Sequence, residues 1–231
     1  MENKTDYMII SAHPDDAEFG VAGSVAKWTS DGKKVAYIVC TSGDKGSSDP
    51  DMNPQELAII REEEQKQAAK LLGVGIVEFL RYPDQELEDT PDFRKHIVRM
   101  IRIYKPEIII TMDPYRKYIW HRDHRITGQT TLDSIYPYAR DHMAYPDLID
   151  EGIMPHKSKE IWFWGTEDIN HTLDITKTMD TKLAALFCHK SQMESMGTEN
   201  IEKWVKNKCQ EIAEGTGFTY AEGFHRVKIP L

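Results

Sequence analysis

The sequence has few cysteines, no long apolar run and no surplus of positive charge, and each of these features excludes a class of protein. No apolar stretch approaches the roughly 20 residues that a membrane-spanning helix needs. The N-terminus lacks the basic start and long apolar segment of a secretory signal. The three cysteines, Cys40, Cys188 and Cys209, are far apart and lack metal-ligand spacing, so we interpret them as small buried side chains in a reducing cytoplasm.

The charge balance argues against polyanionic partners. The chain has 29 lysines and arginines against 38 aspartates and glutamates, which gives a formal net charge of −9. Nucleic acid and anionic membrane surfaces are therefore not expected as partners.

A chain of 231 residues is long enough for one sizeable core, and we expect a single domain over residues 1–231.

Strand-like and helix-like segments alternate along the chain. Short β-rich apolar runs predict strands at 7–12, 35–41, 76–80, 108–111 and 160–164, followed by a short strand at 170–175. Helical patterns cover 17–30, 54–72, 92–104, 122–138, 177–191 and 199–214. This alternation predicts an α/β fold with a mostly parallel sheet, helices on both faces and a modified C-terminal cap after the long polar connection at 140–158.

The first strand–helix turn lacks the glycines of a dinucleotide-binding fold. Where G-x-G-x-x-G would stand, the chain reads AHPDDAEFGVAG, and Gly20 and Gly23 fall inside the predicted helix. No P-loop lysine is present, and acids at this turn would repel phosphate. The default nucleotide-binding function is therefore excluded.

His13, Pro14 and two aspartates occupy this turn instead. One interpretation is purely local: Pro14 shapes the turn, Asp15 or Asp16 caps the helix, and Glu18 completes a capping box. That interpretation leaves His13 and one of the aspartates unexplained.

A second polar cluster, WHRDHR at 120–125, follows the fourth strand. Its His121 and His124 are three positions apart and share a face if they begin a helix, although such a pair is often only solvated. In a doubly wound sheet the first and fourth strands of the series are neighbours at the switch point, where ligands bind. We therefore expect the two clusters to converge on a metal site.

The residue types indicate the metal and its chemistry. Two imidazoles and one carboxylate, with no thiolate nearby, form the open three-ligand set of catalytic zinc, and Fe²⁺ accepts the same set. The open position would hold an acidified water. The spare carboxylate of the Asp15/Asp16 pair would act as general base, and the spare histidine would stabilise an oxyanion and protonate a leaving amine. These groups suit amide hydrolysis.

The A-H-P-D-D segment, the downstream H-x-D-H segment and the T-x-G-x-x-G turn at 41–46 together resemble the LmbE-like, or PIG-L, family of zinc deacetylases. The resemblance includes LAIIREEE at 57–64 and FCHKSQ at 187–192, and it covers nearly the whole chain. It implies a Rossmann-like fold, a cytoplasmic enzyme that removes N-acyl groups from N-acetylglucosamine-type sugars or glycoconjugates, and a homo-oligomer, either a trimer or a hexamer.

The resemblance also implies roles for individual residues. His13, Asp16 and His124 would ligate zinc. Asp15 would be the general base, and His121 the partner of the oxyanion and the general acid.

Other residues carry weaker expectations. Arg61 would contact the sugar, unless it is simply an exposed helix arginine, and Asp84 would touch substrate or form a turn. Asp113 is a candidate for orienting the metal ligands, whereas Asp123 is expected to fix the turn. His189 either lines the pocket or packs within its helix.

The chain departs from the family pattern at two places. Arg122 replaces the proline of the usual H-P-D-H motif, and Asp44 stands where many relatives have glutamate, so the substrate rim is expected to differ. Two alternatives remain: a non-catalytic metal- or carbohydrate-binding protein, and a hydrolase of a non-sugar amide or an ester. Asp15 favours an enzyme, because a binding protein has no use for a spare base.

Overall fold

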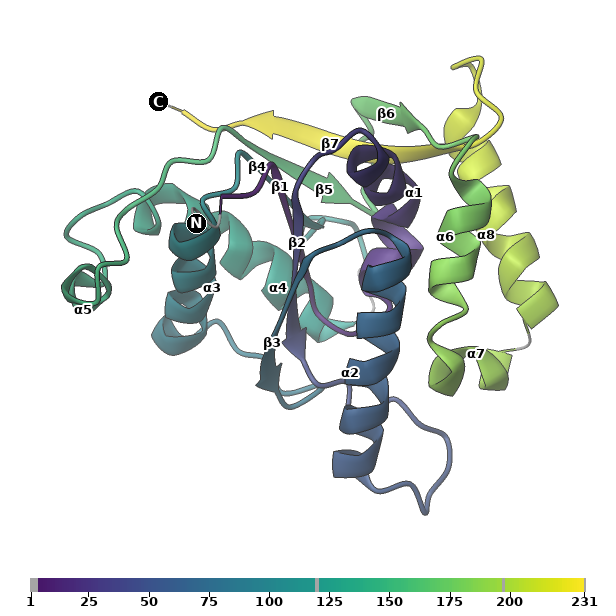
Figure 1. The fold of residues 1–231 in the computed structure, drawn as a ribbon, viewed down its shortest axis with the longest axis horizontal. Coiled ribbons are helices and arrows are strands. Elements are labelled where there is room, and N and C mark those ends of the chain that lie inside the picture. Colours follow the sequence, from purple (N-terminus) through teal and green to yellow (C-terminus); the bar gives the residue numbers. More distant parts are fainter. Residues whose placement is uncertain (1–3, 119–120, 197, 231) are drawn as a thin grey trace.

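The computed structural model describes residues 4–118, 121–196 and 198–230. The fold is a seven-stranded sheet with helices on both faces (Figure 1). The strands are β1 (Tyr7–Ser11), β2 (Val35–Thr41), β3 (Ile76–Tyr82), β4 (Ile108–Met112), β5 (Glu160–Trp164), β6 (His171–Asp174) and β7 (Ala221–Lys228). The helices are α1 (Asp16–Ser30), α2 (Pro54–Leu71), α3 (Pro91–Tyr104), α4 (Arg122–Asp133), the π-helical turn η1 (Ser134–Tyr138), α5 (Pro146–Asp150), α6 (Met179–Leu186), α7 (Lys190–Met196) and α8 (Thr198–Ala213). The predicted α/β class and mostly parallel sheet are confirmed.

The strand order is β3-β2-β1-β4-β5-β7-β6. The first five strands in this order pair in parallel, whereas β7 runs antiparallel between β5 and β6. The sequence predicted every strand except β7. Its segment AEGFHRVK mixes charged and apolar residues, and only pairing with β5 and β6 defines it as a strand.

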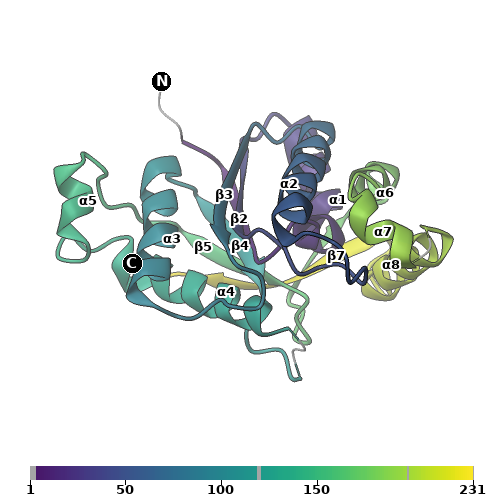
Figure 2. The same ribbon diagram turned by 90° about the horizontal axis from the view of Figure 1, so that it is seen from below.

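Successive side chains of the parallel strands enter two separate cores. Ile9 of β1 packs in a core with α1 and α2, whereas its neighbours Met8 and Ile10 pack in the core that contains α3. Figure 2 shows α1 and α2 on one side of the sheet and α3 and α4 on the other. Because helices cover both faces of the sheet, the sequences of the parallel strands are largely continuous apolar runs.

Three predicted segments differ from the structure in their boundaries. The predicted helix at 122–138 is α4 followed by η1, in which Tyr136 has non-helical backbone angles and Pro137 lacks an N–H donor. The predicted helix at 177–191 is α6, and a separate helix, α7, begins at Lys190. The connection at 140–158 contains the short helix α5. Within the described ranges, no helix combines the length and apolar character required to cross a bilayer.

Strands β1 and β4 are direct neighbours, as the sequence predicted. They pair in parallel with Tyr7 beside Ile108 and Ile10 beside Thr111. Their carboxyl ends therefore lie at the same edge of the sheet, where the chain enters the two polar clusters.

Candidate metal centre

The turn between β1 and α1 presents Asp15 in a strained conformation. Asp15 occupies the N-cap position of α1 with φ 93° and ψ −27°, in the left-handed region that non-glycine residues rarely adopt. Its side chain makes no capping hydrogen bond, so the helix-cap interpretation is wrong for Asp15. Helix α2 holds the turn instead: the Asp15 N–H donates to Gln65 Oε1 at 3.1 Å, and Arg61 Nη2 donates to the Pro14 carbonyl at 2.6 Å and to Asp15 Oδ2 at 3.3 Å.

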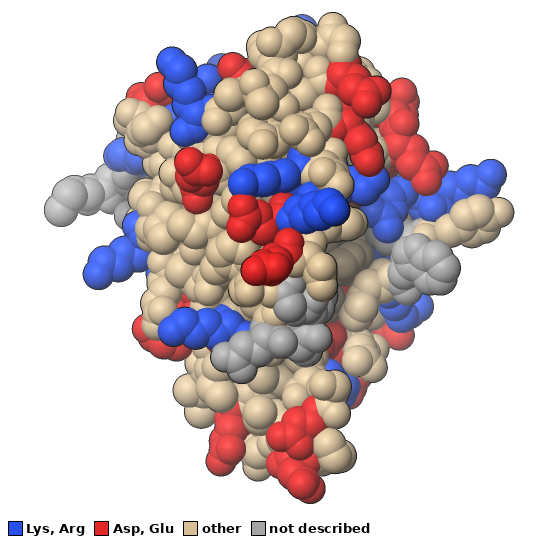
Figure 3. Space-filling view, turned by 90° about the vertical axis from the view of Figure 1, so that its right-hand side faces the viewer, with Lys and Arg blue, Asp and Glu red and all other residues tan. Residues whose placement is uncertain are grey.

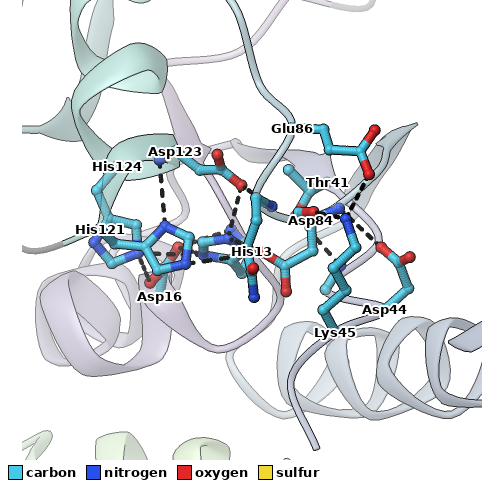
Figure 4. Close-up of polar contacts among 12 residues, drawn as sticks. His13, Asp16, Thr41, Asp44, Lys45, Asp84, Glu86, His121, Asp123 and His124 are labelled. Atoms are coloured by element: carbon cyan, nitrogen blue, oxygen red, sulfur yellow. Dashed lines mark hydrogen bonds and ion pairs between the residues drawn. The ribbon is translucent and has the colours of Figure 1, made fainter.

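Three donor groups from the two clusters meet beside this turn. His13 Nδ1 lies 3.2 Å from Asp16 Oδ2 and 3.2 Å from His124 Nε2, and His124 Nε2 lies 3.1 Å from Asp16 Oδ1. Donors bound tetrahedrally at the usual zinc distances of about 2.0–2.2 Å are themselves separated by about 3.3 Å. The spacing of the three groups therefore fits a divalent metal ion. Figure 4 shows Asp16 and His124 on the same side of His13.

Two carboxylates contact the other nitrogen of His13. His13 Nε2 lies 3.0 Å from Asp84 Oδ1 and 3.4 Å from Asp123 Oδ2. A carboxylate on the far nitrogen of a ligating histidine fixes the tautomer and orientation of the ring. Asp123 is fully buried and also accepts the Gln85 N–H at 2.7 Å, so it does more than fix the turn, which is all we expected of it. Its position beside a predicted ligand was the only signal in the sequence.

His121 is the N-cap residue of α4. Its Nδ1 accepts the Asp123 N–H at 3.2 Å, so the neutral ring carries its proton on Nε2, which lies 3.9 Å from Asp84 Oδ1. The ring stacks on that of His124 with 5.0 Å between centroids, which confirms that the two histidines share a face. Burial lowers the pKa of His121, and the nearby His13 and His124 lower it further.

The adjacent aspartates have opposite electrostatic environments. Burial raises the pKa of Asp15 to about 6, against the opposing charge of Arg61. Burial acts in the same direction on Asp16, but the charges and hydrogen bonds of His124 and His13 outweigh it and lower the pKa of Asp16 well below its usual range. Such a separation lets two neighbouring carboxylates take different roles.

Arg61 is a buried structural residue of the site. Only 3% of it is exposed, so the alternative of an exposed helix arginine is wrong. Its guanidinium donates to the Gly43 carbonyl at 2.9 Å, and a Cβ placed on Gly46 would lie 2.4 Å from Arg61 Nη1. The glycines of the turn at 41–46 thus give Arg61 the room it needs to reach Asp15.

A buried network lies behind Asp15. His189 Nε2 is 3.1 Å from Glu18 Oε2, and Gln65 Nε2 donates to Glu18 Oε1 at 3.0 Å. His189 is completely buried, which supports packing rather than exposure to a pocket. Asp113 forms the turn after β4, where its Oδ1 accepts the Tyr115 N–H at 2.8 Å, and the orienting role expected of it stays a prediction.

The structure brings all the predicted site residues into one connected cluster, in which each contacts at least one other member. These residues are His13, Asp15, Asp16, Arg61, Asp84, His121 and His124.

Comparison with known proteins identifies the family. The family model for PIG-L, described as GlcNAc-PI de-N-acetylase, matches residues 8–135, a range that contains the whole cluster. The chain belongs to the PIG-L family. This PIG-L protein is therefore an enzyme of a deacetylase family, and the resemblance inferred from its motifs is confirmed.

Individual relatives of this PIG-L protein match almost its whole length. It is 34% identical over 220 residues to diacetylchitobiose deacetylase of Thermococcus kodakarensis, covering 95% of this chain and 82% of the relative. It is 27% identical over 204 residues to a probable N-acetyl-alpha-D-glucosaminyl L-malate deacetylase 2 of Bacillus anthracis, covering 86% of each. The structure of N,N'-diacetylchitobiose deacetylase from Pyrococcus horikoshii, complexed with its inhibitor MPG, superposes with a TM-score of 0.92 at 31% identity and covers 96% of this chain and 83% of that one.

Proposed function

We propose that this PIG-L enzyme is a zinc-dependent hydrolase that removes the N-acetyl group from N-acetylglucosamine-type sugars or glycoconjugates. The observation that carries the proposal is the set of donor atoms of His13, Asp16 and His124, spaced 3.1–3.2 Å apart beside the separate carboxylate of Asp15. The names of the relatives, a diacetylchitobiose deacetylase and a probable N-acetyl-alpha-D-glucosaminyl L-malate deacetylase, support the substrate class.

The residues around the proposed ligands would each have a different role in amide hydrolysis. When bound, the ion would polarise the amide carbonyl and acidify a water. Asp15, fixed by Arg61 and Gln65, would take the proton of the attacking water. His121 would donate a hydrogen bond from Nε2 to the developing oxyanion and would relay to the leaving nitrogen the proton that Asp15 took from the water, so that acetate and a free amine result and both side chains return to their starting protonation states.

Arg61 and Asp84, the two residues expected to bind the sugar, have protein partners in this structure. Arg61 bonds to Asp15, and Asp84 contacts His13. We therefore assign both residues first to positioning, and a sugar hydroxyl would share them.

The backbone of Asp15 argues against a protein that only binds metal or carbohydrate. A left-handed conformation at a non-glycine residue costs about 1–3 kcal/mol and persists only where the surrounding structure imposes it. A metal-binding protein needs the ligands but has no need for this strained presentation of a spare carboxylate.

The proposal is tested by measuring metal content and release of acetate together. Wild type, Asp15→Asn and the control Asp51→Asn, at an exposed loop position, are assayed with N-acetylglucosamine and its oligomers. We expect about one zinc per chain in all three proteins, and a loss of activity of at least about 100-fold in Asp15→Asn alone. Wild type that holds zinc but releases acetate from no N-acetyl sugar would overturn the substrate class, and wild type that binds no metal would overturn the centre itself.

We also propose that the enzyme is a homo-oligomer, either a trimer or a hexamer. Light scattering coupled to size-exclusion chromatography measures the mass directly, and a monomeric mass contradicts this proposal.

A further inference from the structure

A groove of about 820 Å³ opens beside the candidate metal centre. Two of the proposed ligands, Asp16 and His124, belong to its lining. Its other walls come from α1, the segment after β4, the end of β5 with the segment that follows it, helices α6 and α8, and strand β7. The groove is therefore continuous with the site at which an amide carbonyl would bind.

Most of the exposed lining of the groove is apolar, and several of its side chains are large aromatics, although charged residues also line it, among them Asp113 and Arg116 after β4 and Lys208 and Glu211 of α8. Phe19 of α1 and Trp204 of α8 make an edge-to-face contact with 6.1 Å between ring centroids. Trp164 closes the inner end against α1, where a Cβ on Gly20 would lie 2.6 Å from its indole ring. Trp204 remains 53% exposed, so its side chain is accessible from the groove.

Polar groups lie on the opposite side of His13 from the groove. Figure 4 shows Asp44, Lys45 and Asp84 on one side of His13, and Asp16 on the other. Among the residues that the structure describes, none of these three polar groups lines the groove, and neither does Arg61. The two sides of the centre thus differ: one carries Asp44, Lys45 and Asp84, and the other opens into the groove with its aromatic side chains.

An amide substrate has two ends that meet at its carbonyl carbon. The amine end of the proposed substrate is a sugar, whose hydroxyls need the polar side. The acyl end is then directed into the groove, where an acetyl methyl, about the size of one water at ~30 Å³, would leave most of the volume unfilled. On the molecular face beside α6 and α8, Lys and Arg are interspersed with Asp and Glu among large uncharged areas (Figure 3), so this face presents no field of one sign to select a charged acyl group.

We infer that the groove is an acyl-binding site and that this enzyme prefers N-acyl amino sugars whose acyl chain is longer and more apolar than acetyl. The inference rests on the proposed function. It makes α8, through Trp204, a determinant of acyl specificity.

Three substrates with the same leaving amine test the inference: N-acetyl-, N-butyryl- and N-octanoyl-glucosamine, with release of free glucosamine as the common readout. Each methylene buried in the groove is expected to raise kcat/KM by about four-fold, so butyryl should exceed acetyl by about ten-fold or more. In Trp204→Ala the octanoyl-to-acetyl ratio of kcat/KM should fall about ten-fold. The control Phe218→Ala removes another partly exposed aromatic side chain that is not part of the groove, and should leave the ratio unchanged.

The possible outcomes separate the two proposals. If acetyl is hydrolysed as well as or better than the longer chains, the acyl site is overturned while the deacetylase function stands. If Trp204→Ala lowers kcat/KM for diacetylchitobiose relative to N-acetylglucosamine but leaves the octanoyl-to-acetyl ratio unchanged, the groove binds the leaving sugar and the inference is wrong. If no amine is released from any of the three, the proposed function fails, and the acyl site fails with it. Thermal unfolding of each variant confirms that it is folded.

Discussion

The Nδ1 atom of His13 lies 3.2 Å from the Nε2 atom of His124, although 111 positions separate the two residues in the chain. The parallel pairing of β1 with β4 brings them together, because each histidine follows the carboxyl end of one of these strands. Asp16 is within 3.2 Å of both nitrogens. A shared cation would satisfy all three groups at once, and this arrangement leads to the first prediction.

Replacing His124 by alanine should abolish metal binding. The substitution removes one of the three proposed ligands, so the affinity for zinc should fall by more than about 100-fold. Metal content after dialysis, measured by mass spectrometry, checks this expectation. The exposed His142 offers the matched control, and full retention of zinc by His124→Ala would show that this histidine is no ligand.

Removing the carboxylate behind His13 should weaken metal binding without removing a ligand. Asp123→Asn takes a charge from the neighbourhood of His13 Nε2, and the affinity for zinc should drop about 10–100-fold. Asp113→Asn is the control, because this carboxylate bonds to the Tyr115 N–H. Equal affinities in the two variants, titrated against a competing chelator, would contradict the orienting role of Asp123.

Arg61→Met should lower both stability and activity while the metal is retained. The substitution leaves Asp15 buried without its cation and removes the bonds to the Pro14 and Gly43 carbonyls. We expect the free energy of unfolding to fall by about 3 kcal/mol, as measured in urea. Arg81→Met breaks only an exposed ion pair with Glu62 and should cost less than about 1 kcal/mol. A loss of similar size in both variants would refute the buried role of Arg61.

Gly128→Ala should push α4 away from the sheet. A Cβ at this position would lie 2.4 Å from the carbonyl oxygen of Met112, so the helix that carries His124 must move. Overpacking of this kind costs about 1–3 kcal/mol, partly offset by the helix propensity of alanine, and affinity for zinc should fall as well. Gly75→Ala meets no atom within 4 Å and should change neither quantity. Unchanged zinc affinity in Gly128→Ala would contradict this coupling.

The buried His189–Glu18 pair should make stability depend on pH. Burial lowers the pKa of His189, but the hydrogen bond to Glu18 and the charges of Glu18, Asp15 and Glu64 outweigh it, and the pKa is raised. A raised pKa in the folded state stabilises the protein fully below the unfolded value of about 6.5, and this contribution is lost as the pH rises through the folded value. The stability difference between wild type and His189→Gln should therefore be largest in mild acid and shrink at higher pH. A difference that is constant from pH 5 to about pH 9 would contradict the charged pair.

Local patterns predicted most of the sheet, because four of the five parallel strands, β1, β2, β4 and β5, are buried almost throughout and each carries its own apolar run. They also predicted the meeting of His13 with His124, because the first and fourth strands of a doubly wound sheet are neighbours at its switch point. Strand β7 was not predicted, because its strand conformation depends on pairing with β5 and β6, and its own sequence has no clear apolar run. The burial of Arg61 was hidden by the acidic residues that follow it, and the contact between Asp123 and His13 exists only once α4 is placed beside β1.

Helix α8 and strand β7, which line the far side of the groove, lie beyond residues 8–135, the range that contains the candidate metal centre. Part of the proposed acyl site thus lies outside the range that contains the metal centre. A library randomised only in α8 should yield enzymes with new acyl preferences that all retain the same metal stoichiometry. In evolution, the same separation would let this scaffold acquire new substrates by changing its last third, while the reaction it catalyses stays the same.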